Sequence, residues 1–170
     1  MTGRALLITG ALATGKTVVV KEVVAIASTL GLRAAAIDLD WLGWTTGATV
    51  GVDELIARNL TTVAGTYAAA GIDHLAMARA VVHPNGLKVI AGELAEWELT
   101  VIRLAAPRGS LERRIRARDS GSELREHLSG LDDMTEQVSA AAPNAYVVVN
   151  DGRDLEDVAN EVMRIAGWML

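Results

Sequence analysis

Cysteine and phenylalanine are both absent from this sequence, and aromatic residues make up only 4% of its 170 residues. The lack of cysteine excludes disulfides, thiolate-bound zinc and cysteine nucleophiles, and it is compatible with a reducing cytoplasm. Hydrophobic residues still account for 51% of the chain, so the core must consist mainly of Ala, Val, Leu and Ile. That composition is typical of a buried parallel sheet covered by helices.

An excess of positive charge and a long apolar segment are also missing. The formal net charge of -5 disfavours a dedicated nucleic-acid-binding protein, which usually carries a basic face. The apolar stretch 18–30 contains Lys21 and Glu22 and is too short to span a bilayer. The start of the chain does not resemble a signal peptide. We expect one cytoplasmic domain over 1–170, with neither nucleic acid nor membrane as a partner.

Five short aliphatic runs alternate with longer segments of helical periodicity. The runs are 5–9, 34–39, 75–82, 99–104 and 146–149. The predicted helices are 16–30, 53–70, 86–97, 111–118, 123–140 and 155–169. This alternation predicts an α/β fold with a five-stranded parallel sheet and helices on both faces. Ligands should then gather at the carboxyl ends of the strands.

A glycine-rich loop stands between the first predicted strand and the first predicted helix, and it matches the complete P-loop pattern G-x4-G-K-T. Its residues are Gly10, Ala11, Leu12, Ala13, Thr14, Gly15, Lys16 and Thr17. Gly10 and Gly15 allow backbone amides to approach a phosphate at the start of the helix. Lys16 can lie between the β- and γ-phosphates, and the Thr17 hydroxyl can coordinate Mg²⁺. The pattern therefore predicts a site for ATP and Mg²⁺, against the simpler interpretation of a glycine turn into a structural helix.

Two carboxylates, Asp38 and Asp40, follow the second aliphatic run, and the two-residue period of a strand puts them on one side of the chain. This pair, together with the loop 10–17, resembles the group of shikimate, gluconate and adenylylsulfate kinases, including chloramphenicol phosphotransferase. The resemblance implies a three-layer P-loop NTPase fold with strand order 2-3-1-4-5. It also implies that Asp40 orients the acceptor hydroxyl while Asp38 lies near Mg²⁺. Exchanged roles, or a capping role in a turn, are the alternatives.

Arginines crowd one predicted helix and the loop after it, at positions 113, 114, 116 and 118. The segment 114–121 is similar to the entry of the mobile lid in the kinases named above, and we expect a short helical lid at about 114–127. The resemblance implies that Arg114 lies against adenine and that Arg118, or else Arg125, closes on the transferring phosphate. A solvated helix face paired with neighbouring acidic residues is the alternative.

The loop 150–153 follows the last predicted strand. In the related kinases this loop wraps around adenine, so the resemblance implies nucleotide contacts here, with Arg153 among them. A polar turn that leads into the final helix explains the same residues equally well.

Candidate acceptor-binding residues follow the second and third aliphatic runs. Trp41 and Trp44 come directly after the candidate base and indicate an acceptor with an apolar or ring portion. Arg58 and Asn59 on the next segment, and His83 after the third run, could face the same pocket. Alternatively, the tryptophans cover the edge of the core and the histidine is structural.

The third run carries no acidic residue at its end, unlike motor ATPases that hold Mg²⁺ and polarise water there. We therefore predict an ATP-dependent phosphotransferase that acts on a hydroxyl of a small metabolite or natural product, as a monomer or homodimer. The glycine run of shikimate kinase is also missing, which disfavours shikimate as the acceptor. A nucleoside or nucleotide kinase, and a nucleotide-sensing module that transfers no phosphate, are the alternatives.

Overall fold

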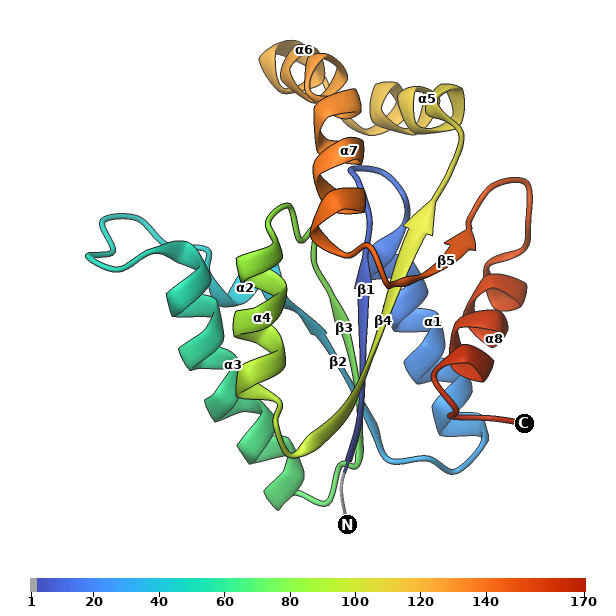
Figure 1. Ribbon diagram of the computed structural model, residues 1–170. Helices are drawn as coiled ribbons and strands as arrows, with labels where there is room; N and C mark the ends of the chain where they lie inside the picture. The colour runs from blue at the N-terminus through green and yellow to red at the C-terminus, as the bar shows by residue number, and fades with distance from the viewer. Residues whose placement is uncertain (1–2) are drawn as a thin grey trace.

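A computed structural model describes residues 3–170 and contains one five-stranded sheet (Figure 1). The strands are β1 (Gly3–Thr9), β2 (Ala34–Asp38), β3 (His74–Ala78), β4 (Trp97–Ala105) and β5 (Tyr146–Val149). Their order is β2-β3-β1-β4-β5, and every neighbouring pair is parallel. The predicted fold class and strand order are confirmed.

Helices cover both faces of the sheet and give the fold its three layers. They are α1 (Lys16–Thr29), α2 (Leu39–Leu42), α3 (Val52–Ala69), α4 (Pro84–Glu93), α5 (Arg108–Arg118), α6 (Gly121–Ser129), α7 (Leu131–Ala141) and α8 (Leu155–Ile165). In Figure 1, α1 and α8 lie on one face, α3 and α4 lie on the other, and α5 and α6 stand beyond the carboxyl edge. Within residues 3–170, no helix combines the length and apolarity needed to cross a membrane.

The central strand β1 is buried on both faces, as its position in a parallel sheet requires. Leu6 and Ile8 pack into the core shared with α1 and α8. Leu7, which points to the opposite face, packs into the core shared with α3 and α4. Since β1 ends at the glycine-rich loop, this rigid strand fixes the start of that loop.

Several predicted boundaries are wrong. The helix expected over 86–97 ends at Glu93, and Trp97 begins β4 instead. The helix expected over 155–169 ends at Ile165. The helix expected over 123–140 is two helices, α6 and α7, which Gly130 separates. The strand expected over 75–82 ends at Ala78, because its pairing with both β1 and β2 ends there. The second strand ends at Asp38, whose side chain accepts a hydrogen bond from the amide of Asp40 and so caps the short helix α2.

Candidate functional site

The loop between β1 and α1 has a backbone that requires glycine at two positions. Gly10 has φ 151° and Gly15 has φ 95°. A Cβ atom at Gly10 would lie 2.7 Å from the carbonyl oxygen of Leu104, and one at Gly15 would lie 2.5 Å from Nδ2 of Asn150. The loop is therefore held in a tight curve at the carboxyl edge of the sheet, directly before the amino end of α1, which favours anions.

Lys16 lies folded back across this loop. Its ammonium donates to the carbonyl oxygens of Gly10 and Ala11, each at 3.0 Å. Burial lowers the pKa of Lys16 to about 8, although the charges of Asp40 and Asp38 oppose this effect. A buried ammonium is stabilised strongly by an anion placed beside it. Lys16 and the surrounding loop therefore fit a phosphate ligand.

The two residues predicted to hold Mg²⁺ are in direct contact. The Thr17 hydroxyl donates to Oδ2 of Asp38 at 2.9 Å. A hydroxyl and a carboxylate oxygen are the ligand types that Mg²⁺ prefers. Because α1 supplies one and the end of β2 supplies the other, the fold itself brings this pair together beside Lys16.

Asp40 faces the same cavity as Lys16, although it lies in the first turn of α2 rather than at a strand end. The cavity has a volume of about 340 Å³, and Thr17, Arg114 and Arg118 also line it. Partial burial, followed by the charge of Asp38, raises the pKa of Asp40, while Arg79 and Lys16 oppose the shift. Its side chain remains open at the cavity mouth, where an acceptor could reach it. A carboxylate with a raised pKa is a better proton acceptor near neutral pH.

Arg79 was not among the predicted site residues. It follows β3 immediately, its side chain is only 12% exposed, and its Nη2 donates to Oδ1 of Asp53 at 2.6 Å. Its Nε lies 3.7 Å from Oδ1 of Asp40. The sequence did offer one signal for Arg79, a basic residue near the carboxyl end of a predicted inner strand. It does not reveal that α2 brings Asp40, and α3 brings Asp53, to this arginine.

Arg114 joins the two loops that were predicted to contact the nucleotide. Its Nη1 donates to the carbonyl of Ala13 at 3.1 Å, and its Nη2 donates to the carbonyl of Asn150 at 2.8 Å. Asn150 in turn donates through Nδ2 to the carbonyl of Thr14 at 2.8 Å. The start of the loop 150–153 is therefore tied to the glycine-rich loop by side chains.

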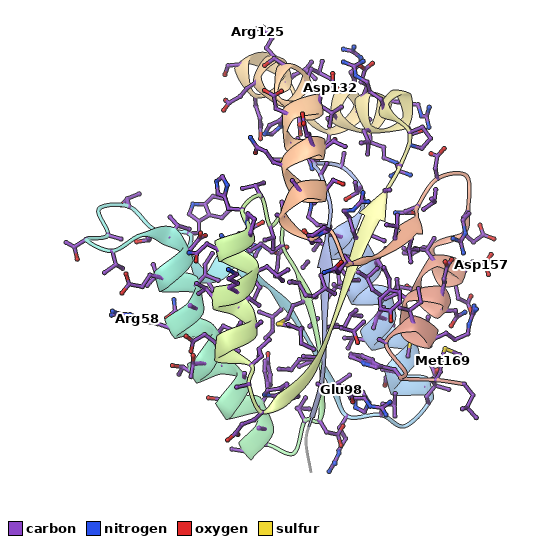
Figure 2. The ribbon with its side chains drawn as sticks, viewed as in Figure 1. Arg58, Glu98, Arg125, Asp132, Asp157 and Met169 are labelled. Atoms are coloured by element: carbon purple, nitrogen blue, oxygen red, sulfur yellow. The ribbon has the colours of Figure 1, made fainter. Side chains whose placement is uncertain are left out.

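Arg118 lines the cavity and is held by the next residue. Its Nε and Nη2 donate to the Asp119 carboxylate at 2.5 and 3.0 Å, and Nδ1 of His127 lies 2.7 Å from the same carboxylate. The Arg118 bonds, followed by the His127 contact, lower the pKa of Asp119 to about 2. Asp119 thus connects the end of α5 to α6. Arg125 does not line this cavity; it is an exposed residue in the middle of α6, at the outer edge of the molecule (Figure 2).

Arg58 and Arg153, both predicted site residues, lie away from the cavity. Arg58 projects from the outer side of α3, where it pairs with Glu54 (Figure 2). Arg153 donates to the carbonyl of Val149 at 3.1 Å and pairs with Glu161 at 2.6 Å. The structure does not bring either residue to Lys16.

Trp41 and Trp44 are stacked on each other, with ring centroids 4.7 Å apart and an interplanar angle of 29°. Their exposed fractions are 68% and 74%, so they do not cover the edge of the core. His83 lines a small cavity of about 40 Å³ together with Arg79 and Asp53. The acceptor-side candidates other than Arg58 therefore lie on the segments around Asp40 and Arg79.

No known family profile matches this chain, and no curated protein matches it in sequence. Solved structures match it in fold. A tunicamycin resistance protein from Deinococcus radiodurans is 13% identical, with a TM-score of 0.67 over 97% of this chain and 96% of that one. A shikimate kinase from Bacteroides thetaiotaomicron is 19% identical, with a TM-score of 0.66 over 96% of this chain and 98% of that one.

An APS kinase from Mycobacterium tuberculosis, in complex with AMPPNP and APS, is 18% identical, with a TM-score of 0.63 over 98% of both chains. These neighbours include members of the group that the sequence resembles. At such low identity they establish a shared fold.

Proposed function

We propose that this protein is an ATP-dependent phosphotransferase that moves the γ-phosphoryl group of ATP to a hydroxyl of a small molecule. One observation carries the proposal: a single cavity is lined by Lys16 and Thr17 from the phosphate loop, by Asp40 from α2, and by Arg114 and Arg118 from α5. A donor site, a candidate base and arginines for closure thus meet at one place. Two of the structural neighbours are kinases, a shikimate kinase and an APS kinase in complex with AMPPNP, which agrees with this chemistry.

Each residue then has a defined task. Lys16 binds the β- and γ-phosphates, and Thr17 and Asp38 would hold Mg²⁺, which neutralises phosphate charge when bound. Arg114, held at the junction of the two loops, lies against the adenine. Arg118 contacts the transferring phosphoryl group, because its planar guanidinium suits phosphate oxygens.

Asp40 orients the acceptor hydroxyl and accepts its proton. The hydroxyl oxygen bonds to the γ-phosphorus as the bond from that phosphorus to the β–γ bridging oxygen breaks, which yields ADP and a phosphate monoester. The proton then passes from Asp40 to solvent. Arg79, whose Nε lies 3.7 Å from Oδ1 of Asp40, limits the rise in the pKa of this carboxyl.

Simple hydrolysis of ATP fits these residues less well. The residue after β3 is Arg79, where motor ATPases place a carboxylate that polarises water. A guanidinium cannot accept a proton from water. The residues of the site therefore favour phosphoryl transfer to an acceptor held at Asp40 over transfer to water.

A transfer assay tests the proposal. ATP consumption is measured with a panel of alcohols, nucleosides and nucleoside monophosphates, for the native protein and for Lys16→Ala and Asp40→Asn. We expect at least one alcohol to accelerate ADP formation, and both variants to reduce this acceleration by about 10²-fold or more. Arg58→Ala, a change on the outer side of α3, is the matched control and should keep full activity.

The outcomes separate the candidate functions. Acceleration only by nucleosides or their monophosphates would identify the second kinase class. Tight ATP binding without transfer to any acceptor would indicate a nucleotide-sensing module and would contradict the proposal.

A further inference from the structure

The strongest feature that the donor site does not explain is the exposed pair Trp41 and Trp44. In a chain with four Trp and no Phe, these two indoles remain mostly in water, whereas Trp168 is buried in the core. Large apolar side chains that gather on a surface beside a cavity usually mark a binding site. Trp41 follows Asp40 directly within α2, so the aromatic pair and a residue that lines the cavity lie on one short segment.

The chain around the aromatic pair is uncharged. The segment 43–51, which joins α2 to α3, contains Gly, Trp, Thr, Ala and Val and no acidic or basic residue. It projects from the body of the protein at the end of α3 (Figure 1). Gly43, at its base, approaches α3 so closely that a Cβ atom would lie 2.7 Å from the Ile56 side chain. The base of the segment is thus packed, while its aromatic portion is presented to solvent.

The charges nearest the candidate base do not favour an anion. Asp40 and Asp53 oppose a single guanidinium, that of Arg79. Arg79 is almost entirely buried, donates to Asp53 at 2.6 Å and lies 3.7 Å from Asp40. A carboxylate, sulfate or phosphate on the acceptor would therefore meet two carboxylates and a cation that is already paired.

The remaining cations of the site serve the donor. Among the described residues that line the two cavities, the other lysine and arginine side chains are those of Lys16, Arg114 and Arg118, and all three line the cavity at the phosphate loop. An acceptor with its own anionic group would have to compete with the triphosphate for these side chains.

We infer that the acceptor is a ring-bearing alcohol without an anionic group, uncharged or cationic, whose ring packs on Trp41 and Trp44 while its hydroxyl reaches Asp40. The inference rests on the phosphotransferase proposed above, and it adds the substrate class. Indole faces bind the apolar faces of rings, and they also attract cations. Two carboxylates share the single guanidinium of Arg79 in the same region, which disfavours an anionic ligand.

Two matched ligands test the charge requirement. Phenyl β-D-glucoside and phenyl β-D-glucuronide share an aryl group and a sugar ring and differ in a hydroxymethyl against a carboxylate. Binding of each is followed by saturation-transfer NMR and titration calorimetry, with Mg²⁺ and AMPPNP present so that no turnover occurs. We expect the glucoside to bind and the glucuronide to bind at least about tenfold more weakly, a difference of about 1.4 kcal/mol.

Variants locate the binding. Trp41→Ala and Trp44→Ala should each weaken glucoside binding by about tenfold or more. Tyr146→Ala, which removes an exposed aromatic side chain on β5, is the control and should leave binding unchanged. Asp53→Asn, a change of nearly equal shape, releases Arg79 and should raise glucuronide affinity by about tenfold.

The inference is overturned if the glucuronide binds as well as the glucoside, if neither ligand binds, or if the tryptophan variants bind the glucoside normally. Failure of the phosphotransferase itself gives a different result. In that case the glucoside still binds at the tryptophan pair, but no alcohol is phosphorylated when ATP replaces AMPPNP. Conversely, transfer to anionic acceptors alone leaves a phosphotransferase and overturns the substrate class.

Discussion

The phosphate side and the acceptor side of the cavity at Asp40 are built on different principles. On the phosphate side, the backbone sets the geometry: two left-handed glycines curve the loop, and Lys16, Thr17 and Asp38 bond to one another or to loop carbonyls. On the acceptor side, side chains set the geometry and the charge: Arg79 is paired with Asp53, and Trp41 and Trp44 are exposed. The first arrangement suits a ligand shared by many proteins, and the second suits a ligand particular to this one.

This contrast predicts how substitutions divide. Changes on the phosphate side should reduce transfer to every acceptor alike, because they act on the donor. Changes on the acceptor side should alter which alcohol is used. The following predictions test that division, beginning with the largest expected effect.

Lys16→Ala should lower kcat by about 10²–10³-fold, the usual cost of losing one charged donor to a developing charge. The loss should be equal for every acceptor. The pH profile sharpens the test: with a pKa of about 8 in the free protein, Lys16 is charged below that pH and neutral above it. The kcat/KM for ATP should therefore fall above about pH 8 in the native protein, and steady-state kinetics across pH checks this. An unchanged kcat in Lys16→Ala would contradict the donor role.

Asp40→Asn should lower kcat by about 10²-fold, within the range typical of general-base catalysis. The pKa of Asp40 is raised, so the rate should increase with pH through a value above that of an ordinary aspartate, as the carboxyl loses its proton. That acidic limb should vanish in Asp40→Asn, while AMPPNP binding stays nearly constant. If the limb persists in the variant, another group is the base.

Much of this contrast was accessible from the sequence. The aliphatic runs predicted the five parallel strands, and Gly10, Gly15 and Lys16 located the phosphate loop, because patterns within short stretches of sequence determine both. The order of the strands came from the resemblance to the kinase group. Arg79 was missed because its role depends on Asp40 and Asp53, which come from two other elements. The amide of Asp40 donates a hydrogen bond to the Asp38 side chain, which caps α2 and places Asp40 in that helix. Hydrophobic periodicity could not predict this, because a capping side chain competes locally with continuation of the strand.

Asp119→Asn should lower kcat by about tenfold and leave nucleotide affinity nearly unchanged, because the amide cannot hold Arg118 through two charge-assisted bonds. The nearby change Asp132→Asn is the control: Asp132 lies on the surface at the start of α7 and pairs with Arg108 (Figure 2). Transfer kinetics and AMPPNP calorimetry measure both variants. Equal losses in the two would show that Asp119 acts only through stability.

Arg58→Ala should have the smallest effect. Its pair with Glu54 is exposed and lies within one helix, so the loss of stability should be below about 1 kcal/mol. Thermal unfolding and the transfer assay should both give values close to those of the native protein. A large rise in the KM of an alcohol acceptor would instead return Arg58 to the acceptor site.

The central claim is that Asp40 accepts the proton of an acceptor hydroxyl while the neighbouring cations bind the triphosphate. The most direct measurement is ³¹P NMR of the protein with Mg²⁺, ATP and phenyl β-D-glucoside. We predict a new phosphate-monoester resonance that grows with ADP, grows about 10²-fold more slowly in Asp40→Asn and is retained in Arg58→Ala. Inorganic phosphate as the only product, or a monoester formed equally well by Asp40→Asn, would contradict the account.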